Sequence, residues 1–115
     1  MKHNFRELKI WKDSILVVKS IYLLTAELPD DEKFGLKSQI QRCAVSVPSN
    51  IAEGSGRTTS KDFRNFLNIS LSSSYELETQ LIIINELFKI EIVEIIEKLH
   101  EVQRMIIGFK KTLEV

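Results

Sequence analysis

The stretch RCAVSVPSNIAEGSGR, residues 42–57, decides the fold, because it sets a proline within an apolar repeat and then ends on two closely spaced glycines. Apolar residues keep helical steps of three and four across Pro48, and the next stop signal is Gly54. A proline inside a helix removes one hydrogen bond and bends the helix axis. Neither phosphate-binding spacing, G-x-G-x-x-G or G-x-x-x-x-G-K-[ST], is present. The stretch therefore predicts one helix kinked at Pro48, and not a ligand-binding loop.

The same apolar period continues through the rest of the chain and indicates amphipathic helices. Alternating segments with Asn-Gly or Asp-Gly turns, which would predict strands, are missing from the sequence. A chain of 115 residues is long enough to bury one core. The predicted fold class is all-α, a single domain over residues 1–115 built as an antiparallel up-down four-helix bundle. Its helices are expected at about residues 5–27, 33–55, 60–88 and 91–113.

The breaks between these helices differ in how clearly the sequence marks them. Pro29 and the acidic residues 30–32 end one helix and suit the start of the next. Thr59-Ser60-Lys61-Asp62 matches the S/T-x-x-D/E capping pattern and predicts the start of the third helix. Residues 89–91 contain no glycine, proline or clean N-cap. The boundary between the third and fourth helices is therefore expected only from loop length and a change of apolar phase.

Charge and cysteine content exclude several classes of protein. Lys and Arg total 16, as do Asp and Glu, so net charge gives no overall attraction to nucleic acid, membranes or acidic ligands. The charges are unevenly distributed, because residues 1–26 and 33–64 are mainly basic and residues 65–101 mainly acidic. A single cysteine allows no intramolecular disulfide. Without a signal-like or membrane-spanning apolar run, the expected location is the cytoplasm, with no membrane partner.

Three consecutive motifs carry a family resemblance that covers roughly residues 5–88. They are FRELKIWKDSILVVKSIYLLTAELP (5–29), LKSQIQRCAVSVPSNIAEGSGR (36–57) and FRNFLNISLSSSYELETQL (63–81). Together they closely resemble the small proteins encoded in intervening sequences of bacterial 23S ribosomal RNA genes. The resemblance implies an antiparallel four-helix protomer that assembles into a ring-shaped homopentamer. A related group, the accessory variability proteins of diversity-generating retroelements, works with a reverse transcriptase and nucleic acid, so the resemblance also implies these partners.

The first helix carries two apolar stripes, which independently favours self-assembly. One stripe contains Leu8, Trp11, Ile15, Val18 and Tyr22. At about 100° per residue the second lies roughly 130° away. One stripe is expected to line the core, and the other either widens that core or packs against a neighbouring subunit. The residues assigned to this oligomer interface are Ile10, Val17, Ile21, Leu24 and Leu28.

Basic residues form two groups that predict contact with an RNA or DNA backbone. The first lies on the first helix and the second at the turn between the second and third helices. In a ring, each group would be repeated around the axis and would attract phosphates. Few aromatic residues lie outside the apolar stripes, so little reading of sequence is expected. The candidate nucleic-acid-binding residues are Arg6, Lys9, Lys12, Arg57, Lys61 and Arg64.

No arrangement of residues predicts catalysis, a metal site or a cofactor. Glu97 and His100 form one Glu-x-x-His pair, whereas di-iron bundles need two such pairs and two further carboxylates. Cys43 is expected to be a buried filler, and the serines near Ser70 lack a recognisable base and acid. The favoured function is a non-enzymatic nucleic-acid-binding oligomer. The alternatives are a protein–protein adaptor for a polymerase or another partner, and an unrecognised enzyme.

Overall fold

The apolar periodicity is realised as helices throughout the part of the chain that the computed structural model describes, which is residues 3–32 and 35–114. Short 3-10 turns at Phe5–Glu7 and Asp30–Glu32 precede the first two α-helices, and these two described ranges contain no strand. The fold class is therefore all-α. The helices are α1 (Lys9–Thr25), α2 (Leu36–Ser55), α3 (Ser60–Phe88) and α4 (Val93–Thr112).

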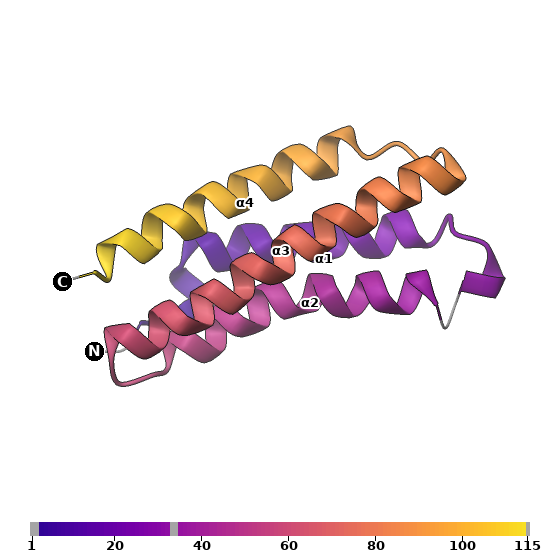
Figure 1. Ribbon diagram of the computed structural model, residues 1–115. Coiled ribbons are helices and arrows are strands. Elements are labelled where there is room, and N and C mark those ends of the chain that lie inside the picture. Colours follow the sequence, from indigo (N-terminus) through magenta and orange to yellow (C-terminus); the bar gives the residue numbers. More distant parts are fainter. Residues whose placement is uncertain (1–2, 33–34, 115) are drawn as a thin grey trace.

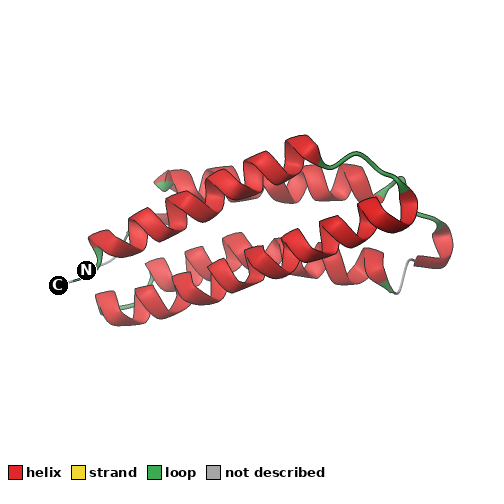
Figure 2. Ribbon diagram, turned by 45° about the horizontal axis from the view of Figure 1, so that its top comes forward, coloured by secondary structure: helices red, strands yellow, loops and turns green. Residues whose placement is uncertain are grey.

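The four helices pack in a cyclic order, in which consecutive helices contact each other and α4 also contacts α1. The most extensive contact is between α2 and α3. Figure 1 shows that α1 begins, α4 ends and the α2–α3 turn lies at one end of an elongated molecule, which measures 46 × 24 × 20 Å. Figure 2 shows the helices as two layers of two. Because the helix contacts are cyclic, the α1–α2 side and the α3–α4 side are opposite faces of the bundle.

The core is filled by one apolar face from each helix, and this corrects the assignment made for α1. The five residues assigned to an oligomer interface are only 0–7% exposed and pack inside the single chain. The other stripe lies at the margin between α1 and α2, where Trp11 and Val18 are half-buried and Tyr22 is 48% exposed. The buried residues, which have no surface to offer a neighbouring subunit, are Ile10, Val17, Ile21, Leu24 and Leu28.

The opening stretch forms one continuous helix, because α2 runs through Pro48 to Ser55. Gly54 is required by packing. A Cβ at this position would lie 2.7 Å from the Cβ of Phe66 and 2.8 Å from Cδ1 of Phe63. The Ser70 hydroxyl of α3 donates to the Val47 carbonyl of α2 at 2.8 Å. Small side chains at this interface therefore let α2 and α3 approach closely.

The helix boundaries agree with the sequence where capping chemistry is clear. Thr59 Oγ1 accepts a hydrogen bond from the Asp62 amide at 3.1 Å, which confirms the predicted start of α3. Helix α1 begins at residue 9 and not at 5, because Phe5–Glu7 forms a 3-10 turn. The expected start of the second helix at residue 33 lies outside the described residues, and the helix itself begins at residue 36.

The junction of α3 and α4 uses signals that the sequence does not display. Lys89 adopts a left-handed conformation (φ 57°, ψ 32°), which glycine more commonly takes, and its amide donates to the Asn85 carbonyl. Oε1 of Glu91 accepts hydrogen bonds from the amides of Ile92 and Val93, both at 2.9 Å. Helix α4 therefore begins two residues later than expected. Across the described part of the chain, no helix combines the length and apolarity needed to span a membrane.

Candidate nucleic-acid interface

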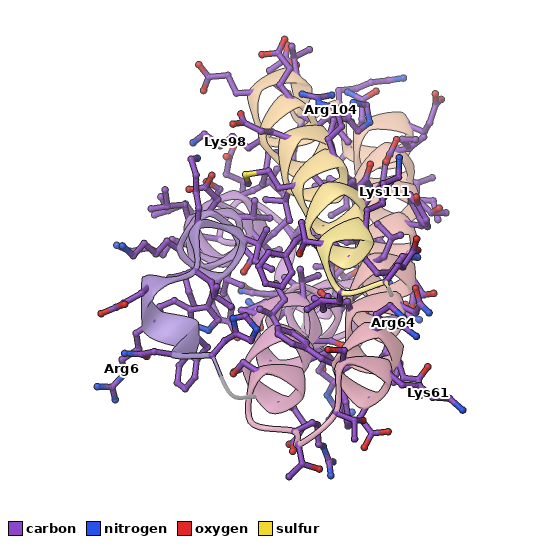
Figure 3. All side chains as sticks on the ribbon, turned by 90° about the vertical axis from the view of Figure 1, so that its left-hand side faces the viewer. Arg6, Lys61, Arg64, Lys98, Arg104 and Lys111 are labelled. Carbon is purple, nitrogen blue, oxygen red and sulfur yellow. The ribbon has the colours of Figure 1, made fainter. Side chains whose placement is uncertain are left out.

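The two predicted basic groups lie at the same end of the bundle, because α1 begins where the α2–α3 turn lies (Figure 1). They occupy different sides of that end. Figure 3, which views the molecule along its axis, shows Arg6 on the α1 side and Lys61 and Arg64 on the α3 side. The six candidate residues therefore share an end of the molecule without forming one continuous patch.

Two of the six predicted cations are neutralised by carboxylates of their own helices. Lys9 Nζ lies 2.6 Å from Asp13 Oδ2, and this hydrogen bond and charge raise the pKa of Lys9. Arg57 Nη2 lies 3.5 Å from Glu53 Oε2, and its guanidinium also sits 4.6 Å from the centre of the Phe66 ring. Each internal partner competes with a phosphate for the same charge. Lys9 and Arg57 are therefore weaker candidates than the sequence indicated.

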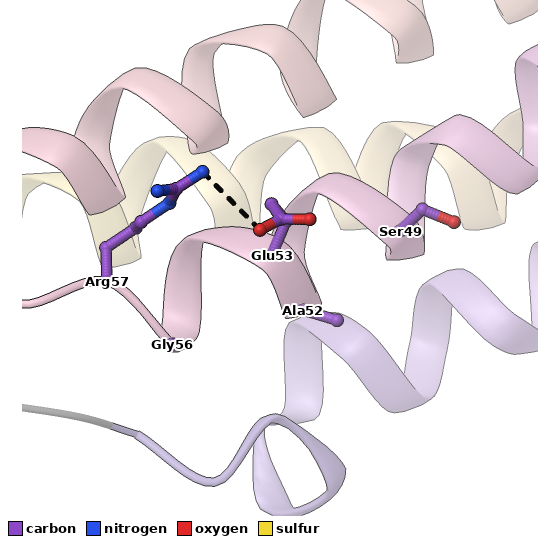
Figure 4. A pocket seen from close by; sticks show the side chains of 5 residues that line it. All are labelled: Ser49, Ala52, Glu53, Gly56 and Arg57. Carbon is purple, nitrogen blue, oxygen red and sulfur yellow. Dashed lines mark hydrogen bonds and ion pairs between the residues drawn. The ribbon is translucent and has the colours of Figure 1, made fainter.

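A hollow of about 530 Å³ lies beside the Arg57–Glu53 pair at the end of α2. Figure 4 shows the guanidinium pointing to the Glu53 carboxylate, with Ser49, Ala52 and Gly56 completing the lining. The hollow is open to solvent, and Glu53 places a negative charge within it. A phosphate group would be repelled by Glu53, so this hollow is not the favoured anion site.

A further group of cations, which have no carboxylate partner among the described residues, lies on the face between α3 and α4. Figure 3 shows Lys61, Arg64, Lys111 and Arg104 on the same flank, whereas Lys98 lies on the other side of α4. Lys110 joins this flank through a 2.8 Å hydrogen bond to Asn68 Oδ1. We call this set the α3–α4 basic surface, and its members are Lys61, Arg64, Arg104, Lys110 and Lys111.

The cations of the α3–α4 basic surface keep their charge available. Arg64 Nη1 donates to the Leu113 carbonyl at 2.5 Å, and Lys110 donates to an amide oxygen, so both partners are neutral. Within residues 3–32 and 35–114, the lysine or arginine ion pairs shorter than 4.0 Å are Lys9–Asp13 and Arg57–Glu53, and the remaining close pair is His100 with Glu78. No member of the surface appears in these pairs, so its charges can bind an external anion.

Three members of the surface, Arg104, Lys110 and Lys111, were missed by reasoning from the sequence. The charge balance of long segments does not reveal them, because they follow directly after the acidic stretch 65–101. Two signals could have found them. Arg104 and Lys111 are seven residues apart and share a helix face. Lys110 and Lys111 also lie in the last turn of α4, where the helix dipole favours cations.

A polar cluster of Glu78, His100 and Gln103 joins α3 to α4. Glu78 Oε2 lies 2.9 Å from His100 Nε2, and Glu78 Oε1 accepts a hydrogen bond from Gln103 Nε2 at 3.0 Å. The bond to His100, followed by that to Gln103, lowers the pKa of Glu78. His100 therefore binds a carboxylate of α3, and not Glu97, its Glu-x-x-His partner in sequence.

Among the described residues, Cys43 is not an activated nucleophile and the acidic side chains form no metal site. Burial, followed by the charge of Glu76, raises the pKa of the Cys43 thiol to about 12, and its Sγ lies 3.1 Å from the Ser73 carbonyl oxygen. Such a thiol stays protonated at neutral pH, unlike an activated nucleophile. Across residues 3–32 and 35–114, no three His, Cys, Asp or Glu side chains group closely enough to hold a metal ion.

The fold and its charged face define a class: small all-helical proteins with one apolar core and, between two helices, a row of cations without carboxylate partners in the described residues. Comparison with protein families narrows this class. The family model described as 23S rRNA-intervening sequence protein matches residues 6–108. The chain belongs to the 23S rRNA-intervening sequence protein family, as its sequence motifs indicated. No curated protein gives a significant match to the chain.

Proposed function

We propose that the protein is a non-enzymatic cytoplasmic homo-oligomer that binds the backbone of RNA or DNA. The observation that carries this proposal is the α3–α4 basic surface, whose cations have no carboxylate partner in the described residues. Lysine and arginine side chains that neutralise phosphates release condensed counterions, which provides most non-specific affinity. Phosphate contacts carry no sequence information directly, so strands of different sequence are expected to bind similarly.

The proposed oligomer is the pentameric ring that the family resemblance implies. Its support in this chain is an apolar groove of about 280 Å³ between α1 and α2. Trp11, Ile15 and Val18 line one side, and Val45 and Pro48 line the other. Burying such a groove against another subunit would remove apolar surface from water. The α1–α2 side is opposite the α3–α4 side, so assembly there leaves the basic surface accessible and repeats it around the ring.

The proposed protomer is an antiparallel bundle in which α2 bends at Pro48. Alternating helix directions are supported by the position of the α2–α3 turn beside the start of α1 and the end of α4 (Figure 1). A bend is supported by the missing amide donor of Pro48. Asn50 Nδ2, which donates to the Ser46 carbonyl at 2.8 Å, gives the backbone an additional partner there. An experimental structure with a straight α2 would contradict the bend.

Fluorescence anisotropy with short single-stranded RNA and DNA of unrelated sequence tests the proposal. At about 50 mM salt, the wild-type protein is expected to bind all strands with similar affinity. The Lys61→Glu/Arg104→Glu/Lys111→Glu variant should weaken binding to every strand by at least about tenfold, since three phosphate contacts become repulsive. Lys98→Glu, which changes a cation on the other flank of α4, is the control and should bind nearly as well as wild type. Failure of the wild type to bind would refute the proposal.

The adaptor alternative is favoured by several exposed apolar residues near the other end of the bundle. Ile82, Ile83, Leu87 and Val93 are 40–65% exposed around the α3–α4 connection. Exposed apolar patches commonly mark protein contacts. In this alternative, a reverse transcriptase or another polymerase would bind these residues without nucleic acid. The adaptor would be favoured if the protein binds no RNA or DNA strand but binds such a purified enzyme, and if Leu87→Asp abolishes the binding of the enzyme.

A further inference from the structure

Tyr75 is an exposed aromatic residue that the sequence did not single out. Its side chain is 48% exposed on α3. Its backbone carbonyl accepts a hydrogen bond from Thr79 Oγ1 at 3.0 Å. Among residues 3–32 and 35–114, no hydrogen bond or ring contact involves the phenol ring itself. The ring is therefore free to bind an external group.

Helix geometry places Tyr75 on the α3–α4 basic surface. Tyr75 follows Lys61 by 14 residues, which is close to four helical turns, so the two share a face of α3 and lie about 21 Å apart. The bridges from α3 to α4 fix the register, because Asn68 binds Lys110 and Glu78 binds Gln103. Tyr75 therefore lies near the turn of α4 that carries Arg104.

An exposed aromatic ring beside a row of unpaired cations matches the chemistry of single-stranded nucleic acid. Proteins that bind single strands combine a positively charged path for the backbone with aromatic side chains on which bases stack. The distance of about 21 Å from Lys61 to Tyr75 leaves room for several backbone phosphates of one strand. A duplex, whose bases already stack on one another, would leave the ring unused.

We infer that the α3–α4 basic surface is a site for single-stranded RNA or DNA, in which one base stacks on Tyr75. This inference rests on the proposed function, because it requires the cations of the same surface to hold the backbone. It goes beyond that function by naming the single strand as the ligand and by assigning a base contact.

Two strands of equal length and charge separate stacking from phosphate binding. One is a labelled twelve-nucleotide deoxythymidine strand, and the other carries abasic sugars at every position. Wild-type protein should bind the thymidine strand at least about fivefold more tightly in fluorescence anisotropy, since stacking of one base commonly has an effect of this size or larger. Tyr75→Ala should remove this preference and leave the salt dependence unchanged, whereas Tyr75→Trp should retain the preference.

Ile82→Ala is the matched control, because Ile82 has the same 48% exposure and lies two turns further along the same face of α3. It should keep the preference of the wild type. If Tyr75→Ala binds both strands as the wild type does, the stacking inference is overturned while backbone binding stands. If the wild-type protein binds neither strand at about 50 mM salt, the proposed function fails, and this inference fails with it.

Discussion

Replacing Gly54 by alanine tests the close contact of α2 with α3. In an ordinary helix, changing glycine to alanine stabilises the folded state by about 0.5–1 kcal/mol, because the unfolded chain loses conformational freedom. At Gly54, however, the new Cβ would lie 2.7 Å from the Cβ of Phe66 and 2.8 Å from Cδ1 of Phe63. The Phe66 Cβ is attached to the α3 backbone and cannot rotate away. The two helices must therefore separate or shift to accept the methyl group.

The two effects have opposite signs, and the steric effect is the larger. Overpacking of a well-packed core commonly costs about 1–3 kcal/mol. The overpacking cost less the ordinary helix gain is about 0–2.5 kcal/mol, so Gly54→Ala should lower the free energy of unfolding by about 1 kcal/mol. For a domain of this length, that is a decrease in Tm of roughly 4–8 °C.

Gly108 of α4 provides the matched control, because a Cβ built there has no atom within 4 Å. Gly108→Ala should therefore stabilise the protein by about 0.5–1 kcal/mol. Both variants and the wild type would be unfolded in urea at one protomer concentration and followed by circular dichroism. Equal or greater stability of Gly54→Ala relative to Gly108→Ala would refute the packing described for α2 and α3.

Three further changes test other parts of the structure. Glu78→Gln should lower stability by about 1 kcal/mol at pH 7 through its weakened bond to His100. Because the pKa of Glu78 is lowered in the folded state, the stability that its carboxylate contributes is lost in acid. The difference in free energy of unfolding between wild type and Glu78→Gln should therefore narrow below about pH 4, and a difference that stays constant with pH would contradict this. Thr59→Ala should cost about 1 kcal/mol in urea unfolding by removing the cap on Asp62, and an unchanged midpoint would contradict the cap. Val45→Asp should reduce the mass measured by light scattering from about five protomers, and an unchanged pentamer would exclude this groove as the interface.

The sequence predicted the helices well where local chemistry determines their ends. The apolar period extends across Pro48, and Thr59 with Asp62 forms a recognisable cap, so α2 and the start of α3 were predictable. The end of α3 at Phe88 agrees with the expected bound, although no capping signal in the sequence marks it, because Lys89 adopts a left-handed conformation that lysine seldom takes. Its capping depends on Asn85 and on the path of the connection, which no local pattern reveals.

The face of α1 that enters the core could not be chosen from the sequence, because two apolar stripes met the same periodicity. The choice depends on how α2 and α4 pack around α1, and it places Ile21 at 0% exposure while leaving Tyr22 48% exposed. Packing of this kind is a property of the whole bundle. The periodicity of one helix therefore predicts that it is amphipathic, and not which neighbour each face meets.

The candidate site was predicted in part. The sequence identified Lys61 and Arg64, but the contribution of Arg104 and Lys111 required the placement of α4 beside α3. Neutralisation of Lys9 and Arg57 was readable in principle, because each has an acidic residue four positions away on the same helix face. The remaining members of the surface could be found only from the fold, which brings α3 and α4 side by side.

The salt dependence of single-strand binding tests most directly whether the α3–α4 basic surface holds nucleic acid by its phosphates. Anisotropy titrations at several salt concentrations would give the slope of log affinity against log salt for the wild type and for Lys61→Glu/Arg104→Glu/Lys111→Glu. Each neutralised phosphate contributes about 0.7 to this slope for single strands, so removing three contacts should flatten it by about 2. If the surface binds the strand through its phosphates, we expect a steep wild-type slope and this flattening. A variant with wild-type slope and affinity would contradict it.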